Sequence, residues 1–220
     1  IINSANNPTG AVYRGEILTH LASRCERNGI WLLSDETYGD LCYNRQFWSL
    51  SQRISSRTVV MSSFSKVFSI PGFRLGYALA SPEVADKLAL SNSTLISCMP
   101  AFTQTGVVGG MKHLDEYAMN IRGKYADLAA DCVARINETG VMRSQAPHAG
   151  FYLFLDVGQS GLGGNRFADQ LLRRFHTAVT PGRSFGEAYE DYIRVAFCGD
   201  PGDVLEGIER IILCAGETSE

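Results

Sequence analysis

Four short segments of this sequence combine residue types that could do chemistry. They are NNPTG at 6–10, SDETY at 34–38, SFSK at 63–66 and PGFRLGY at 71–77. A lysine such as Lys66 can act as a nucleophile where burial or a nearby cation lowers the pKa of its amine. Arg74 can bond two oxygens of a phosphate or a carboxylate at once. The candidate chemistry is therefore nucleophilic attack beside an anion site.

Each segment alone also has an ordinary structural explanation. Asn, Pro and Gly are turn formers, and Ser34 or Asp35 could cap a helix. Most lysines are solvated, and Arg74 could lie on the surface with its stem packed down. Against this, the carboxyl end of a buried strand, where Asp35 would lie, is where open α/β sheets place ligand contacts.

A further candidate is a lone charge in an apolar segment. Arg194 lies within YIRVAF at 192–197. A buried arginine needs an anionic partner, whereas an arginine on an edge strand can simply face water. Both interpretations stay open from the neighbouring residues.

Helices that alternate with short apolar strands would position the first four segments. Helical spacing predicts a helix over 14–28, and Ser81-Pro82-Glu83 begins another. Apolar runs predict the strands Ile30–Leu33, Thr58–Met61 and Phe73–Ala80. This order favours an α/β layer with a largely parallel sheet.

The pattern changes near residue 115. An amphipathic stripe predicts one long helix from 117 to 136. The elements expected after it are a strand at 150–157, a helix at 165–176, a strand at 192–197 and a helix at 204–213. We therefore expect two domains, residues 1–114 and a smaller α+β domain over residues 115–220.

Composition excludes several classes of protein. The 220 residues carry a formal net charge of only −3, with scattered Lys and Arg, which argues against nucleic acid as a partner. No apolar run is long enough to span a membrane, and no signal pattern opens the chain. The six cysteines form no C-x-x-C pair and the four histidines have no metal-ligand spacing, so no metal is expected. Reduced, buried thiols favour the cytoplasm.

Together, in this order and spacing, the segments resemble those of the class I/II aminotransferases, a family of fold-type-I pyridoxal-phosphate (PLP) enzymes. YIRV at 192–195, GFY at 150–152 and PGRSFG at 181–186 resemble further landmarks of that family. The resemblance covers the whole chain, and SFSK with RLG is its most specific part. It implies the PLP-dependent transferase-like fold. Residues 1–114 would be the C-terminal portion of the large PLP-binding domain, with an incomplete sheet, and residues 115–220 the small C-terminal domain.

The resemblance also implies a catalytic set. Lys66 would form the Schiff base with PLP and then serve as the base that moves a proton. Asp35 would pair with the pyridine nitrogen and keep it protonated, which makes the ring a better electron sink. Asn7 and Tyr38 would donate to the phenolic oxygen of PLP. Glu36 is given only a packing or capping role.

The same resemblance implies two anion sites. Ser63, Ser65 and Arg74 would bind the cofactor phosphate through two hydroxyls and one guanidinium. Arg194 would bind the α-carboxylate of the substrate, with Asn7 beside it. The bidentate geometry of arginine suits that role.

The implied function is transfer of an amino group from an α-amino acid to a 2-oxo acid. Because the chain starts at Ile1 and runs almost at once into NNPTG, we expect it to be a fragment whose own activity is doubtful. We expect a homodimer for the full-length parent.

Two alternatives stay open. A PLP-dependent C–S lyase or decarboxylase would use the same residues, since the same carbanion can eliminate or lose CO₂. An aminotransferase-like sensor domain of a transcription regulator would bind PLP as a ligand. The identity of the amino acid is not encoded in these motifs.

Overall fold

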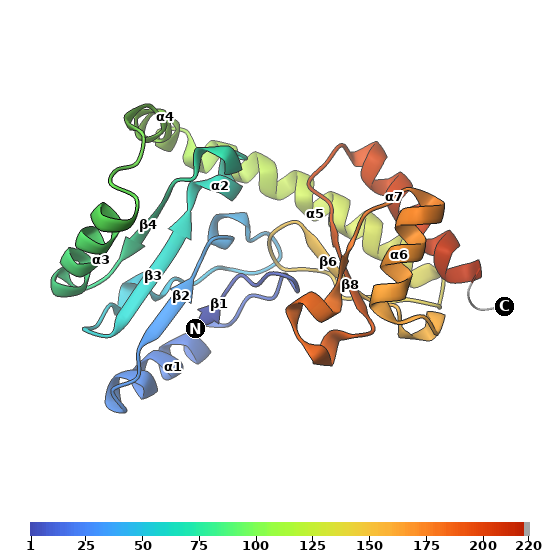
Figure 1. The fold of residues 1–220 in the computed structure, drawn as a ribbon, viewed down its shortest axis with the longest axis horizontal. Helices are drawn as coiled ribbons and strands as arrows, with labels where there is room; N and C mark the ends of the chain where they lie inside the picture. The colour runs from blue at the N-terminus through green and yellow to red at the C-terminus, as the bar shows by residue number, and fades with distance from the viewer. Residues whose placement is uncertain (218–220) are drawn as a thin grey trace. The chain divides into compact units, whose positions relative to one another are not determined.

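A computed structural model describes residues 1–217 (Figure 1). The chain folds into two compact units. Unit 1 comprises residues 1–6 and 11–122, and unit 2 comprises residues 7–10 together with the described chain from residue 123 onward. The division falls inside one helix, α5 (Leu114–Glu138). The predicted domain boundary at residue 115 stays a proposal.

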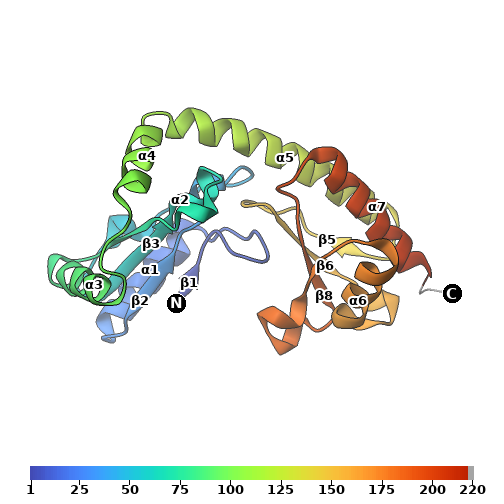
Figure 2. The ribbon, with the colours of Figure 1, turned by 45° about the horizontal axis from the view of Figure 1, so that its top comes forward.

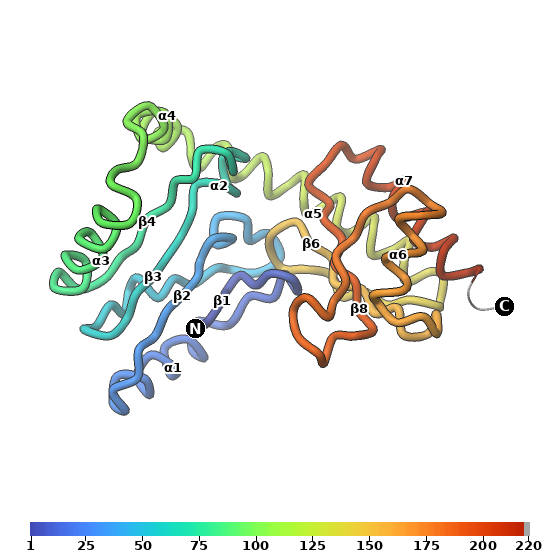
Figure 3. Tube along the Cα trace, in the orientation of Figure 1, coloured from blue at the N-terminus to red at the C-terminus, as the bar shows by residue number. Residues whose placement is uncertain are grey.

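Unit 1 contains a four-stranded sheet in the order β1-β2-β3-β4. The first three strands are parallel and β4 is antiparallel to β3, so the expected α/β architecture with a largely parallel sheet is confirmed. The strands are β1 (Ile2–Asn3), β2 (Leu32–Asp35), β3 (Thr58–Ser63) and β4 (Gly76–Leu79). The strand predicted at 73–80 is shorter than expected because Pro71–Phe73 forms a 3-10 turn before it. The tube in Figure 3 shows the chain leaving β3 through α2 and returning along β4.

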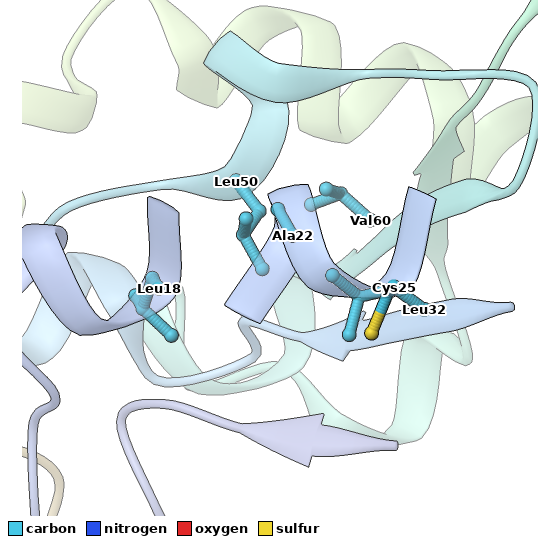
Figure 4. Packing of buried hydrophobic residues seen from close by; sticks show 6 residues of the cluster. All are labelled: Leu18, Ala22, Cys25, Leu32, Leu50 and Val60. Atoms are coloured by element: carbon cyan, nitrogen blue, oxygen red, sulfur yellow. The ribbon is translucent and has the colours of Figure 1, made fainter. Parts of the chain in front are cut away.

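Helix α1 (Gly15–Arg27) covers one face of this sheet. Its apolar side packs against β2, β3 and a 3-10 turn at Leu50–Arg53 (Figure 4). The buried cluster consists of Leu18, Ala22, Cys25, Leu32, Leu50 and Val60. Unit 1 also contains α2 (Phe64–Val67), α3 (Pro82–Leu95), α4 (Ala101–Met111) and the first part of α5.

Unit 2 is built on an antiparallel sheet in the order β5-β6-β8-β7. Its strands are β5 (Arg143–Ser144), β6 (Tyr152–Asp156), β7 (Thr180–Pro181) and β8 (Tyr192–Ala196). Two helices, α6 (Gly163–Phe175) and α7 (Pro201–Glu217), lie side by side in both ribbon views (Figures 1 and 2). This is the small α+β unit that the sequence predicts.

The two faces of that sheet differ in character. Leu155 and Ile193 alternate onto one face and are fully buried, as are Phe167 of α6 and Ile208 of α7. The other face carries Arg194, because residues alternate along a strand. One face therefore builds the core and the other presents polar and aromatic groups.

Among the helices of residues 1–217, none combines the length and the apolar character needed to cross a membrane. All six cysteines are free thiols. Cys98 and Cys198 are exposed, and the other four are buried.

Candidate functional site

The carboxyl ends of β2 and β3 carry three of the predicted cofactor residues. Asp35 is the last residue of β2, Ser63 is the last residue of β3, and Lys66 follows in α2. The two strands are parallel neighbours, and the amide of Glu36 donates to the carbonyl oxygen of Met61 at 2.8 Å. Because parallel neighbours end at the same edge of a sheet, the structure brings these residues to one edge.

Asp35 has one oxygen engaged and one available. Its Oδ1 accepts from the amide of Thr37 at 3.1 Å and from Thr37 Oγ1 at 2.7 Å. Within residues 1–217, Oδ2 accepts no hydrogen bond. The turn with Thr37 thus fixes the carboxylate and leaves one oxygen for a donor from outside the chain.

Ser63 and Ser65 lie at the turn between β3 and α2. Ser63 Oγ caps α2 by accepting from the amide of Ser65 at 3.1 Å, and it donates to the carbonyl oxygen of Leu75 at 3.3 Å. The Ser65 side chain is buried, and its hydroxyl makes no hydrogen bond to the described chain. Lys66, one residue later, is half-buried.

Arg74 approaches the same turn from β4. Its backbone is left-handed, with φ of 53°, where the 3-10 turn passes into the strand. The amide of Phe64 donates to the carbonyl oxygen of Leu75 at 3.2 Å, which fixes this segment beside the SFSK turn. Arg74 Nη1 donates to the carbonyl oxygen of Pro71 at 2.9 Å, and its other nitrogens have no acceptor among residues 1–217. The exposed guanidinium is therefore available to an anion.

Tyr38, another predicted residue of unit 1, is buried and only 7% exposed. It precedes a 3-10 turn, Gly39–Leu41, and its carbonyl oxygen lies 3.9 Å from Cys42 Sγ. Burial raises the pKa of the Cys42 thiol to about 12; Arg122 opposes this effect and Asp40 adds to it. The neighbour of Tyr38 in this turn is thus an uncharged thiol.

Arg194 of unit 2 is held by groups that carry no charge. Its guanidinium carbon lies 4.3 Å from the ring centre of Tyr152 and 5.1 Å from that of Phe185. Nη1 donates to Asn7 Oδ1 at 3.0 Å, and Nη2 donates to Thr180 Oγ1 at 3.2 Å. The structure therefore brings the two predicted substrate-binding residues, Asn7 and Arg194, into direct contact.

The charge of Arg194 is not compensated within the described chain. Its Nε is buried without a hydrogen-bond partner, and none of the ion pairs in residues 1–217 includes this arginine. The alternative of an edge-strand arginine is wrong, because β8 lies between β6 and β7. A half-buried cation with a bare N–H group and aromatic walls is suited to a carboxylate.

Sequence reasoning missed three residues that hold Arg194: Tyr152, Thr180 and Phe185. Tyr152 and Phe185 lie in the segments GFY and PGRSFG. Their role depends on the pairing of β6, β7 and β8, which periodicity alone does not give.

The donor set of unit 1 fits PLP. The available groups are Asp35 Oδ2, the Ser65 hydroxyl and the Arg74 guanidinium. A carboxylate suits a pyridinium N–H, and a hydroxyl with a guanidinium suits a phosphate. Within the described residues, no group of three or more His, Cys, Asp or Glu side chains could hold a metal ion.

The chain belongs to the class I and II aminotransferases, whose family model matches residues 1–211. Enzymes of this family depend on PLP.

Individual proteins that this chain resembles are also aminotransferases. An aspartate aminotransferase of Thermococcus kodakarensis is 32% identical over 96% of this chain and 53% of its own length. Aromatic-amino-acid aminotransferase 2 of Thermococcus litoralis is 30% identical over 96% of this chain and 55% of its own length. The crystal structure of an aromatic aminotransferase from Pyrococcus horikoshii superimposes with a TM-score of 0.91 at 27% identity, covering 98% of this chain and 59% of that one. The chain spans about half the length of the curated relatives it matches.

Proposed function

We propose that the chain serves in a PLP-dependent aminotransferase that moves an amino group from an α-amino acid to a 2-oxo acid. The observation that carries the proposal is the setting of Arg194, whose charge is held by two rings and two neutral oxygens. Both substrates of a transamination carry an α-carboxylate, and one guanidinium can bind both in turn.

Unit 1 would supply the groups that hold the cofactor. Asp35 Oδ2 would accept the pyridine N–H, while Thr37 keeps the carboxylate aimed. Ser65 and Arg74 would donate to the phosphate, and Tyr38 would donate to the phenolic oxygen. When bound, PLP supplies the electron sink that stabilises a carbanion at the substrate Cα.

Lys66 would hold the cofactor until substrate arrives, and its Nζ would then remove the proton from the substrate Cα. Lys66 directly follows the buried residue Ser65 in helix α2, whose first turn is capped by Ser63. The backbone that carries the Lys66 amine is therefore fixed. A base attached to fixed backbone can reach the same carbon in each turnover.

A PLP titration followed by absorbance tests this proposal. We expect the wild-type chain, in its full-length context, to show a visible band that borohydride makes permanent. The Lys66→Ala variant should lack that band. Mass spectrometry after reduction should find the added mass on Lys66. No band in the wild type would contradict the proposal.

A second step separates transamination from its rivals. An aminotransferase consumes an amino acid continuously only when a 2-oxo acid is present, because the amino group needs an acceptor. Turnover without any 2-oxo acid would instead indicate elimination or decarboxylation. PLP binding without turnover of any amino acid would favour a sensor domain.

We further propose a cytoplasmic homodimer. The six free thiols support a reducing compartment. The homodimer rests on the likeness to the family. Sedimentation equilibrium of the full-length protein checks it, since a monomer would contradict it.

A further inference from the structure

Glu36 is a buried carboxylate that pairs with no basic side chain. It is only 7% exposed, and no ion pair among residues 1–217 includes it. Three neutral donors satisfy it instead. Ser34 Oγ and the amide of Leu50 donate to Oε1 at 3.0 Å and 2.9 Å, and Ser49 Oγ donates to Oε2 at 2.6 Å. This arrangement fixes the side chain firmly, because a buried carboxylate needs every one of its donors.

The backbone of Glu36 joins the segments that carry the candidate cofactor residues. Its amide donates to the carbonyl oxygen of Met61 in β3 at 2.8 Å. Its carbonyl oxygen accepts from Ser62 Oγ at 3.4 Å and from the amide of Gly39 at 2.9 Å. One residue thus connects β2, the end of β3 before SFSK, and the turn after Tyr38.

The Glu36 carboxylate lies on the Ser34 side of the sheet, because Ser34 Oγ donates to its Oε1 at 3.0 Å, and Asp35 alternates to the other face. Burial alternates along β2, with Leu32 and Ser34 buried and Asp35 only half-buried. Leu32 and Leu50 belong to the cluster beneath α1 (Figure 4). The amide of Leu50 donates to Glu36. Because neighbouring strand residues alternate, anchoring Glu36 on the α1 side directs Asp35 to the opposite face.

We propose that Glu36 is a positioning residue for Asp35, acting by tying the end of β2 to the Ser49–Leu50 segment. This inference rests on the proposed cofactor role of Asp35. Without its anchor, the β2 end could rotate, and both the Asp35 carboxylate and the Thr37 turn that holds it would lose their orientation.

The amide of Thr37 reports on this directly, since it donates to Asp35 Oδ1 at 3.1 Å. In the PLP-free chain, Glu36→Ala should speed hydrogen exchange of the Thr37 amide about tenfold or more. The reason is that the end of β2, no longer tied to the Ser49–Leu50 segment, opens more often. Glu36→Gln should stay near the wild-type rate. Its amide oxygen can still accept from Leu50, and its NH₂ can donate to Ser49 Oγ.

The matched control is Val60→Ala. Val60 is 2% exposed and lies in the same buried cluster as Leu32 and Leu50. It makes no hydrogen bond to either Oε atom of Glu36. We expect it to lower stability while leaving the Thr37 exchange rate, relative to other amides of unit 1, unchanged.

A second readout uses PLP itself. The visible circular dichroism of bound PLP reports how the ring is held. Glu36→Ala should lose most of this signal per bound cofactor and weaken PLP binding about tenfold, whereas Val60→Ala should keep the signal.

Three results would overturn the inference. One is unchanged Thr37 exchange in Glu36→Ala; another is an equal effect in Val60→Ala. The third is Thr37 exchange as fast in Glu36→Gln as in Glu36→Ala, since the glutamine side chain can keep its hydrogen bonds to Ser49 and Leu50. If wild-type protein binds no PLP, the proposed function fails, and the exchange measurement alone still decides the role of Glu36.

Discussion

Arg194 shows how a cation can be fixed without an anion among residues 1–217. Two aromatic rings and two neutral oxygens hold it, and its Nε has no partner in the described residues. Rings and neutral oxygens orient a guanidinium without neutralising it. The geometry therefore keeps the attraction for an incoming carboxylate intact.

Arg194→Lys should weaken binding of an amino-acid substrate about tenfold to hundredfold. One ammonium cannot contact Asn7 and Thr180 together while covering two rings. The measurement is the substrate-induced change in the visible spectrum of PLP-loaded protein. Arg135→Lys is the matched control, because Arg135 makes an exposed ion pair with Glu209 at 2.7 Å. Equal affinity in wild type and Arg194→Lys would contradict the carboxylate role.

Cys42 makes the stability of the protein sensitive to alkali. Burial raises the pKa of its thiol from 9.0 to about 12. Above pH 9 the unfolded chain loses this proton while the folded chain keeps it, so the free energy of unfolding falls as pH rises toward 12. The maximum slope is about 1.4 kcal/mol per pH unit for one thiol. Below pH 9 the thiol contributes no pH dependence.

Cys42→Ala should therefore reduce the loss of stability above pH 9. Urea unfolding at pH 8 and pH 10 measures it, as the difference between the two free energies for each variant. Cys98→Ala changes an exposed thiol, so between pH 8 and pH 10 this variant should lose as much stability as the wild type does. A Cys42→Ala chain with the wild-type difference would show that the thiol does not carry the effect.

At the scale of the element, α6 approaches β8 too closely for a side chain. A Cβ on Gly164 would collide with the carbonyl oxygen of Tyr192, a backbone atom that cannot move aside. Gly164→Ala should therefore destabilise unit 2 by about 1–3 kcal/mol, as overpacking does. Because β8 carries Arg194, the variant should also weaken substrate binding.

Gly123→Ala makes the same chemical change where space is open. Gly123 lies inside α5 with nothing within 4 Å of an added Cβ. The substitution should raise the free energy of unfolding by about 0.5–1 kcal/mol, since alanine favours a helix more than glycine does. Thermal unfolding of both variants gives the comparison; stability changes of the same sign would refute the packing argument.

The elements that the sequence predicted are those with a clear periodicity. Helices α1 and α5 and strand β3 occur close to where they were expected, and β2 begins two residues later than expected, at Leu32. Helix α4 was missed because AFTQTGVVGGM contains three glycines and no polar face. The two-residue strands β1, β5 and β7 are too short to give a pattern. Motif spacing predicts Lys66 as the candidate nucleophile, whereas the rings around Arg194 depend on strand register, which motif spacing does not give.

At the scale of the whole molecule, unit 1 exposes apolar surface that a stable monomer would bury. All four residues of β4 are exposed, and in the described chain no strand pairs with its outer edge. Tyr77 and Leu79 are each 43% exposed, and Phe102 of α4 is 74% exposed. A free edge strand next to exposed apolar groups is a template for association.

The 220-residue chain on its own should therefore self-associate as its concentration rises, and Leu79→Lys should reduce this association. A charge at the end of the free edge disfavours pairing with a second strand, because it would have to be desolvated. Sedimentation velocity over a hundredfold range of concentration measures the effect. Leu172→Lys on α6, where the leucine is 53% exposed in unit 2, is the control and should associate like the wild type. If both lysine variants reduce association equally, net charge is responsible and the β4 edge is not the contact.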